Sequence, residues 1–309
     1  MKKNQKLKGN LILLLTAFIW GVSFIAQSKG VEEISPVAFN GIRSVLGGLV
    51  LLPVIGFLDI SKKKKGIAVQ KADKTLWIGG LVCGTCLCVA STLQTMGMVY
   101  TSPGKSGFLT ALYMVIVPIL WLFMGKKPRP VILVSVLVAL SGLYLMCMDE
   151  SFSINYGDIL TIICALVFAF HILAIDYFSP RVDGVKLACL QFFVCGLFNL
   201  IAMVIFGKTP GVSQVISLWA SIGYSGVLSC GVAYTLQIVG QKYTDPTSAS
   251  ILMSLESVFA TLTTVILIAC GWSITGGALT AREIWGCVLM FVAILLVQLP
   301  EKSTESGKN

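Results

Sequence analysis

Ten apolar runs, each about as long as a helix that crosses a bilayer, dominate this sequence and restrict what it can fold into. A hydrocarbon core about 30 Å thick needs ~20 mostly apolar residues per helix. Because lipid offers no hydrogen bonds, each run must satisfy its own backbone donors and acceptors, as a helix does. We therefore predict an all-α integral membrane protein with ten transmembrane helices, at residues 10–28, 36–57, 75–98, 104–124, 131–148, 158–178, 185–206, 216–239, 247–270 and 282–299.

The composition also indicates a lipid environment. Only 12% of the residues are charged, whereas a typical soluble domain has about 25%, and the mean hydropathy is +0.89. The low charge excludes a large water-facing surface, and the high hydrophobicity excludes intrinsic disorder. Nearly all of the ten cysteines fall inside apolar runs, where cysteine behaves as a small buried hydrophobe. They predict no disulfide framework.

The basic residues predict the orientation of the chain in the membrane. With the N-terminus inside, the inner segments hold 18 of the 23 lysines and arginines. The outer segments hold four, and Arg43 lies within a span. Cytoplasmic loops carry such an excess, so both termini are predicted to be cytoplasmic. The net charge of +9 is then a topology signal rather than a sign of nucleic-acid binding, and the Lys62–Lys65 run is predicted to be a solvated loop.

An internal duplication is the most informative pattern in the chain. The segment ASTLQTMGMVYTSP from Ala90 aligns without gaps with AYTLQIVGQKYTDP from Ala233, with eight identities in fourteen positions and an offset of 143. The first spans align more weakly, at an offset of 148, which pairs Trp20 with Phe168, Ser23 with His171 and Arg43 with Gln191.

The duplication divides the ten spans into two repeats of five. The first repeat covers residues 1–150, and the second covers 151–309 together with a short polar C-terminal tail. Because five is odd, the second repeat must enter the membrane from the opposite side. The basic residues agree, since Lys105 falls outside and Lys242 inside. Inverted repeats of this kind are typical of secondary transporters, which bind solute near mid-membrane between the halves.

The chain resembles the EamA-type branch of the drug/metabolite transporter superfamily. The resemblance is carried by Trp20-Gly21 in the first span, Arg43 in the second, and the repeated Tyr-Thr-x-Pro motif at Tyr100 and Tyr243. It implies two EamA repeats over nearly the whole chain and a carrier of small metabolites, often amino acids or related solutes and often in the efflux direction. It also implies a central cavity lined by spans 1, 3, 4, 6, 8 and 9.

Glu256 is the only carboxylate expected deep in the membrane, near the middle of the ninth span. An ionisable group there costs at least ~2.5 kcal/mol on insertion scales, so its presence needs a reason. We interpret it as a binding anion for a cationic or zwitterionic group, or as a proton carrier; the alternative is a structural hydrogen bond to another helix. Tyr113 occupies the equivalent position in the first repeat, at an offset of 143.

Other polar residues inside the spans complete a candidate substrate-binding set. Trp20, Ser23 and Gln27 share one helical face, His171 is the repeat partner of Ser23, and the amides at 94 and 237 are a repeated pair. Packing or interhelical hydrogen bonding is the alternative role for each. The predicted set is Trp20, Ser23, Gln27, Gln94, Tyr113, His171, Tyr234, Gln237 and Glu256. Arg43 could hold a substrate carboxylate, but we favour a structural role because span two is peripheral in the resembled fold.

These patterns predict a secondary transporter of the cell membrane that is not an enzyme and needs no cofactor or metal. No GxxxxGK[ST] motif for ATP-driven transport is present, and the C-x-x-C-x-C at Cys83–Cys88 is better explained by packing than by metal binding. The expected partners are a small solute and the lipid bilayer, with protons as candidate coupling ions and no nucleic acid. The alternatives are a membrane-embedded enzyme acting on lipid and a non-transporting receptor or scaffold.

Overall fold

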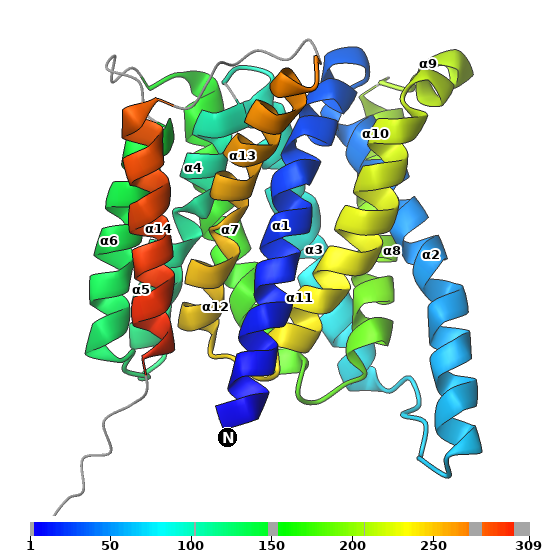
Figure 1. The fold of residues 1–309 in the computed structure, drawn as a ribbon. Helices are drawn as coiled ribbons and strands as arrows, with labels where there is room; N and C mark the ends of the chain where they lie inside the picture. Colours follow the sequence, from blue (N-terminus) through cyan, green and yellow to red (C-terminus); the bar gives the residue numbers. More distant parts are fainter. Residues whose placement is uncertain (1–2, 102, 148–153, 207, 272–279, 300–309) are drawn as a thin grey trace, which may run out of the picture.

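The structure, a computed structural model, describes residues 3–101, 103–147, 154–206, 208–271 and 280–299. The predicted polar tail at 300–309 lies outside the described residues. Within the described ranges every regular element is a helix. The helices stand side by side as a bundle, and the start of the first and the end of the last lie at the same end of it (Figure 1).

The helices follow the chain in this order: α1 (Lys3–Glu33), α2 (Pro36–Lys64), α3 (Lys74–Met98), α4 (Pro103–Ala111), α5 (Tyr113–Phe123), α6 (Pro130–Cys147), α7 (Tyr156–Phe178), α8 (Gly184–Ile205), α9 (Val212–Ser217), α10 (Trp219–Gly223), the π-helix η1 (Tyr224–Ala233), α11 (Tyr234–Gln241), α12 (Pro246–Met253), α13 (Glu256–Ala269) and α14 (Ala281–Gln298). In the described part of the chain, nine stretches are long and apolar enough to cross a membrane. They coincide with nine of the ten predicted spans. The tenth prediction, 131–148, falls on α6, whose apolar part is the shorter stretch Pro130–Leu145.

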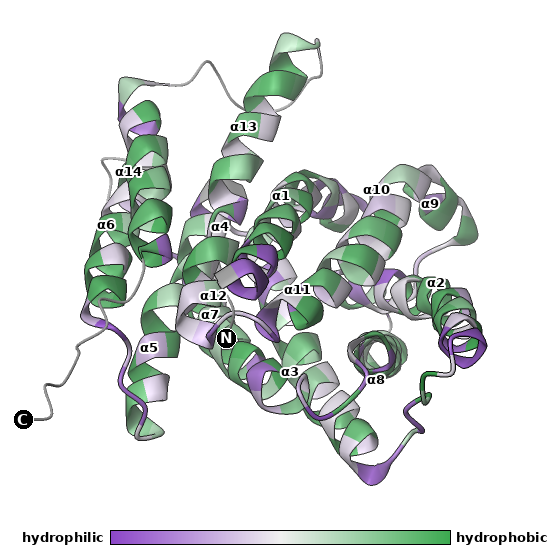
Figure 2. Ribbon diagram, turned by 60° about the horizontal axis from the view of Figure 1, so that its bottom comes forward, coloured by the Kyte–Doolittle hydropathy of each residue, from purple (hydrophilic) through white to green (hydrophobic). Residues whose placement is uncertain are grey.

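The outside of the bundle is apolar and its interior holds polar side chains. Figure 2 shows hydrophobic colour along the bodies of the helices and hydrophilic colour mainly at their ends. Large apolar side chains such as Trp77 and Phe123 are exposed, whereas Asn40, His171 and Gln191 are buried. This arrangement is expected of a chain whose surrounding solvent is hydrocarbon.

Helix packing places five elements around the centre of the bundle. α1 packs against α13, α11 and η1, while α3 packs against α7 and α8. α2 lies along α8, and α6 and α14 pack mainly against each other at one side (Figure 1). The helices α1, α3, α7, α11 and α13 therefore surround the region in which the predicted site residues meet.

The predicted solvated loop at Lys62–Lys65 is wrong for its first three residues. Helix α2 continues to Lys64, with three lysines in its last turn. Cations are stabilised at a helix C-terminus by the partial negative charge of its free carbonyl groups, which explains the extension.

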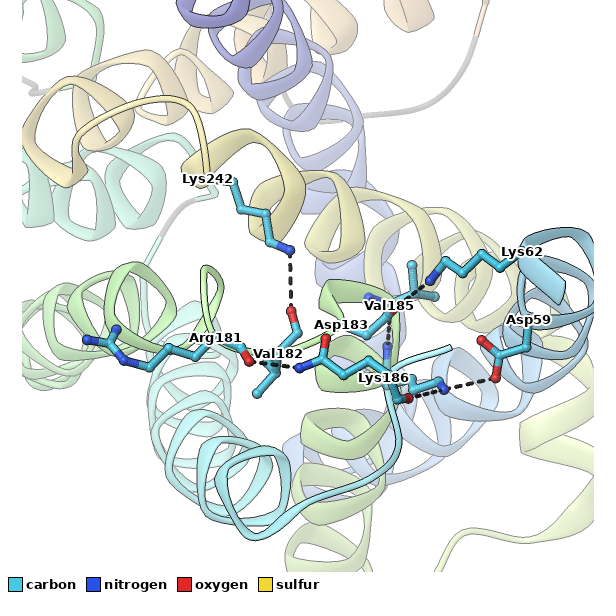
Figure 3. Close-up of polar contacts among 9 residues, drawn as sticks. Asp59, Lys62, Arg181, Val182, Asp183, Val185, Lys186 and Lys242 are labelled. Atoms are coloured by element: carbon cyan, nitrogen blue, oxygen red, sulfur yellow. Dashed lines mark hydrogen bonds and ion pairs between the residues drawn. The ribbon is translucent and has the colours of Figure 1, made fainter. Parts of the chain in front are cut away.

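An ionic cluster ties the end of α2 to the start of α8 (Figure 3). Lys62 Nζ lies 2.6 Å from Asp183 Oδ2, and Lys186 Nζ lies 2.8 Å from Asp59 Oδ2. Lys242 Nζ donates to the carbonyl of Val182 at 3.3 Å. The cluster links elements of both halves of the sequence at the end of the bundle where α1 begins.

Asp183 should stabilise the protein in two ways. Burial raises the pKa of its carboxyl, but the hydrogen bonds from Lys62 and from backbone amides outweigh burial, so the pKa lies below its usual value. The carboxylate also caps α8 by accepting from the amides of Val185 and Lys186. Since the unfolded chain has the higher pKa, this contribution is present above that pKa and is lost as the pH falls through the folded value.

We therefore expect Asp183→Ala to lower the free energy of unfolding in detergent by about 1 kcal/mol more than Asp183→Asn, because asparagine keeps the cap. Thermal unfolding between pH 7 and pH 3, monitored by circular dichroism, measures both effects. The loss of stability between pH 7 and pH 3 should be smaller in both variants than in the parent protein, because both lack the Asp183 carboxylate. Equal loss in the two variants would contradict the capping role.

Candidate functional site

Two transmembrane segments are interrupted at equivalent places, and each interruption introduces a predicted site residue. The segment from Pro103 breaks at Leu112 and resumes as α5 with Tyr113. The segment from Pro246 breaks before Leu255 and resumes as α13 with Glu256. Both breaks contain tight i→i+3 backbone bonds, from Val115 to Leu112 and from the amide at 257 to the carbonyl at 254. Discontinuous helices are the usual builders of mid-membrane sites in transporters.

The two residues after these breaks contact each other. Tyr113 Oη donates to Glu256 Oε1 at 3.1 Å. Both side chains are buried, with exposed fractions of 4% and 5%. The offset of 143 thus identified two residues that meet at the centre of the bundle.

A small cavity surrounds this pair. It holds about 30 Å³ of space for the centres of water molecules, which is room for roughly two or three waters. The cavity is lined by Trp20, Phe24, Gln27, Arg43, Gln94, Thr110, Tyr113, Phe168, His171, Ile172, Ser229, Tyr234, Gln237, Met253 and Glu256.

Eight of the nine predicted site residues line this cavity, and Ser23 does not. Ser23 is fully buried on α1 and accepts a hydrogen bond from Gln27 Nε2 at 3.3 Å. Ser23 therefore orients the Gln27 side chain from the side away from the cavity. In the other repeat, His171 at the equivalent position is large enough to reach the cavity directly.

Aromatic rings form one wall of the cavity. The rings of Trp20 and Tyr234 lie 4.6 Å apart, between centroids, and tilt by 58°. Tyr234 also makes edge contacts with Phe192 at 5.4 Å and with His171 at 6.1 Å. Such a wall offers an apolar surface with a few polar atoms at its edge, as small-molecule sites commonly do.

Several polar atoms around the cavity have no hydrogen-bond partner among the described residues. They are Trp20 Nε1, Gln27 Oε1, Gln237 Oε1 and His171 Nδ1. His171 uses its other nitrogen for Gln191 Oε1, at 3.1 Å, and Gln94 donates to Thr110 Oγ1 at 3.2 Å. Buried polar atoms are normally satisfied, so unpaired ones beside a cavity indicate a bound polar molecule or water.

Arg43 lies at the cavity as well as in a structural contact, since its Nε donates to Asn40 Oδ1. It lines the cavity and is buried, although we favoured a structural role for it at the periphery. The other lining residues outside the predicted set are Phe24, Thr110, Phe168, Ile172, Ser229 and Met253. Phe24 and Thr110 were recoverable by helical spacing from Trp20 and Tyr113. Ser229 was not, because it lies in the π-helix η1, whose side-chain spacing differs from that of an α-helix.

Each end of the bundle has a close helix crossing of the same type. Gly97 on α3 meets Gly157 on α7, where a Cβ on either glycine would lie 2.6–2.8 Å from the other's carbonyl oxygen. The repeat-related Gly240 and Gly9 meet at the opposite end, where the corresponding distances are 3.0–3.3 Å. Only residues without side chains permit such close contact.

A side-chain contact accompanies each crossing. Thr101 Oγ1 donates to Asp158 Oδ1 at 2.9 Å, and the repeat-related Thr244 Oγ1 donates to Asn10 Oδ1 at 2.9 Å. Asp158 is additionally paired with Lys105 at 2.6 Å. One end of the bundle is thus held by an ion pair as well as a hydrogen bond.

In the described part of the chain, no group of three or more His, Cys, Asp and Glu side chains is arranged to hold a metal ion. The cavity offers one carboxylate, one guanidinium, four amide and imidazole side chains and an aromatic wall for the recognition of a polar molecule.

Comparison with known proteins gives one family and several relatives. The model of the EamA-like transporter family matches twice, over residues 7–148 and 155–299. An uncharacterized transporter of Archaeoglobus fulgidus is 29% identical, over 96% of this chain and 87% of its own. The uncharacterized transporter YoaV of Bacillus subtilis is 22% identical, over 92% of this chain and 94% of its own. A solved crystal structure shares the fold, with a TM-score of 0.72 and 17% identity, over 94% of this chain and 96% of the other.

The contact between Tyr113 and Glu256 can be tested by a double-mutant cycle. Tyr113→Phe leaves a buried carboxylate without its donor, which should lower the free energy of unfolding by about 1–3 kcal/mol. Unfolding of Tyr113→Phe, Glu256→Gln and the double variant should show a coupling of at least ~0.5 kcal/mol. Tyr156→Phe removes an exposed hydroxyl and serves as the control. Strict additivity would show that the contact contributes nothing.

Proposed function

This chain belongs to the EamA-like transporter family and is a multi-pass integral protein of the cell membrane, and we propose that it moves a small solute by alternating access. The family and the names of its relatives point to a transporter rather than an enzyme. The observation that carries the proposal is the buried cavity around Glu256 and Tyr113, with its unpaired polar atoms. The nine predicted residues are its proposed substrate-binding set, with Ser23 acting through Gln27.

The proposed architecture is ten transmembrane helices in two inverted repeats, residues 1–150 and 151–309, with both termini in the cytoplasm. The double match of the family model, the equivalent helix breaks and the equivalent glycine crossings support the repeats. The distribution of 18 against four basic residues supports the orientation.

The two closures at the ends of the bundle support the alternating mechanism. The hydrogen bond between Asn10 and Thr244 joins the first helix of the first repeat to the second repeat. At the opposite end, the hydrogen bond between Asp158 and Thr101 joins the first helix of the second repeat to the first repeat. Both are closed here, around a cavity that holds only a few waters. We propose that transport opens one closure while the other stays shut, and that the conformation described is the occluded one.

The proposed solute is an amino acid or a related compound, moved in the efflux direction. Glu256 would bind its cationic group or carry a coupling proton, Gln94 and Gln237 would orient its polar groups, and the Trp20–Tyr234 wall would contact its apolar part. Amides can accept and donate, so this pair suits carboxylate, amine or hydroxyl groups.

Glu256→Gln should reduce transport at least tenfold, because it removes the charge while keeping the size of the side chain. The measurement is counterflow in proteoliposomes against a panel of amino acids, amines, nucleosides and sugars, at several pH values. Unchanged flux with an unchanged pH profile would remove Glu256 from the mechanism.

The matched control is Glu32→Gln, which makes the same substitution on an exposed carboxylate near the end of α1. It should transport like the parent. Size-exclusion profiles and thermal unfolding of both variants separate loss of function from loss of fold.

The closures can be separated by thiol accessibility in a cysteine-free background with one cysteine at Thr110 in the cavity. Asp158→Asn removes a charged hydrogen bond, so the introduced cysteine should react about tenfold faster with an impermeant thiosulfonate. The increase is expected only when the reagent is added on the side of Lys105. Thr244→Val should raise the rate of this reaction severalfold, and only when the reagent is added on the opposite side. If both variants change access from the same side, the proposed pair of closures is wrong.

A further inference from the structure

We propose that Arg43 is the anion-binding group of the central cavity and that Asn40 positions its guanidinium, so that the transported solute carries a carboxylate. This inference rests on the proposed transport function and specifies the chemical class of its substrate. It assigns to α2 a direct part in the site.

The guanidinium is fixed at one nitrogen. Arg43 Nε donates to Asn40 Oδ1 at 2.8 Å. Asn40 is fully buried and is itself held by α3, since its Nδ2 donates to Thr95 Oγ1 at 2.8 Å and to the Ser91 carbonyl at 3.2 Å. Phe39, whose ring centroid lies 5.5 Å from Arg43 Cζ, supports the guanidinium from another side. These contacts determine where the planar group points.

The other two nitrogens of the same guanidinium are available. Among the described residues, Nε makes the only side-chain hydrogen bond of Arg43, and the three ion pairs of the described chain do not include it. The side chain is 4% exposed and lines the cavity. A guanidinium held through Nε presents its remaining donors as a fork that matches the two oxygens of a carboxylate.

Among the described residues that line the cavity, no carboxyl group lies close enough to pair with this guanidinium. The cavity's one carboxylate, Glu256, is not within 4.0 Å of Arg43 Nη or Nε atoms, because no ion pair joins them. Glu256 is engaged instead by Tyr113. One cavity therefore presents a guanidinium and a carboxyl group at separate places, which suits a solute with both a carboxylate and an ammonium group.

The site is also asymmetric, because the two repeats carry different side chains at the position of Arg43. The equivalent of Arg43 in the second repeat is Gln191, a neutral side chain whose oxygen is engaged by His171. Glu256 likewise has the neutral Tyr113 as its equivalent. A solute with one carboxylate and one ammonium group would therefore bind in a single orientation in an otherwise pseudo-symmetric site.

The test compares solutes that differ only in the carboxylate. Thermal stabilisation and counterflow are measured for the twenty L-amino acids and for their C-terminal amides, which keep the ammonium and the side chain. The parent protein should be stabilised by, and should transport, at least one amino acid and should bind its amide at least tenfold more weakly. Arg43→Gln should abolish this preference, with a roughly ten- to hundredfold loss of affinity for the acid.

Two further variants separate binding from a structural role. Arg43→Lys keeps the charge but not the fork, and should retain part of the preference for the acid. Asn40→Asp keeps Arg43 but places a carboxylate against it, and should weaken acid binding because the internal anion competes. Arg181→Gln changes an exposed arginine that contacts Tyr177 and should leave the preference unchanged.

The outcomes are distinct. If acids and amides behave alike in the parent protein, or if folded Arg43→Gln keeps the preference, the inference is overturned while transport stands. A different result would be that no solute is transported, while carboxylates stabilise the parent protein but not Arg43→Gln. That result would support the anion site and contradict the proposed transport function. If Arg43→Gln fails to fold, the comparison of Asn40→Asp with the parent decides.

Discussion

The absence of hydrogen-bonding partners in hydrocarbon is the constraint on which this structure depends. It forces every spanning segment to be helical and makes each polar side chain turn toward another part of the protein. The buried groups Asn40, Arg43, His171 and Gln191 all obey it, each through a bond to a neighbouring residue. A cavity lined by partly unpaired polar atoms is therefore costly in such a bundle, and its presence at the centre is the strongest structural argument for a bound polar solute.

Much of this arrangement could be predicted from the sequence, because both the spans and the duplication are long-range patterns. Apolar runs predict the helices, and the offset between repeats places Tyr113 at the position equivalent to Glu256, although it does not predict that the two side chains are hydrogen-bonded. The inward face of α1 also followed, since Trp20 and Gln27 share a helical side. These predictions succeed because helical periodicity and internal symmetry are written in residue spacing.

The remaining features depend on which helices become neighbours. The cavity position of Arg43 follows from the way α2 lies against α3 and α8, and no spacing within α2 indicates this. Ser229 reaches the cavity through the altered register of a π-helix. The continuation of α2 through Lys64 depends on helix-end electrostatics and on Asp183, which comes more than a hundred residues later in the chain.

The small cavity and the two glycine crossings have a consequence for the rate of the proposed transport cycle. The space around Glu256 and Tyr113 is small, and each end of the bundle has a close helix crossing. In the proposed cycle, a solute enters only when one crossing separates and leaves only when the other does. Movement of packed helices, rather than diffusion of the solute, would then set the upper limit of the transport rate.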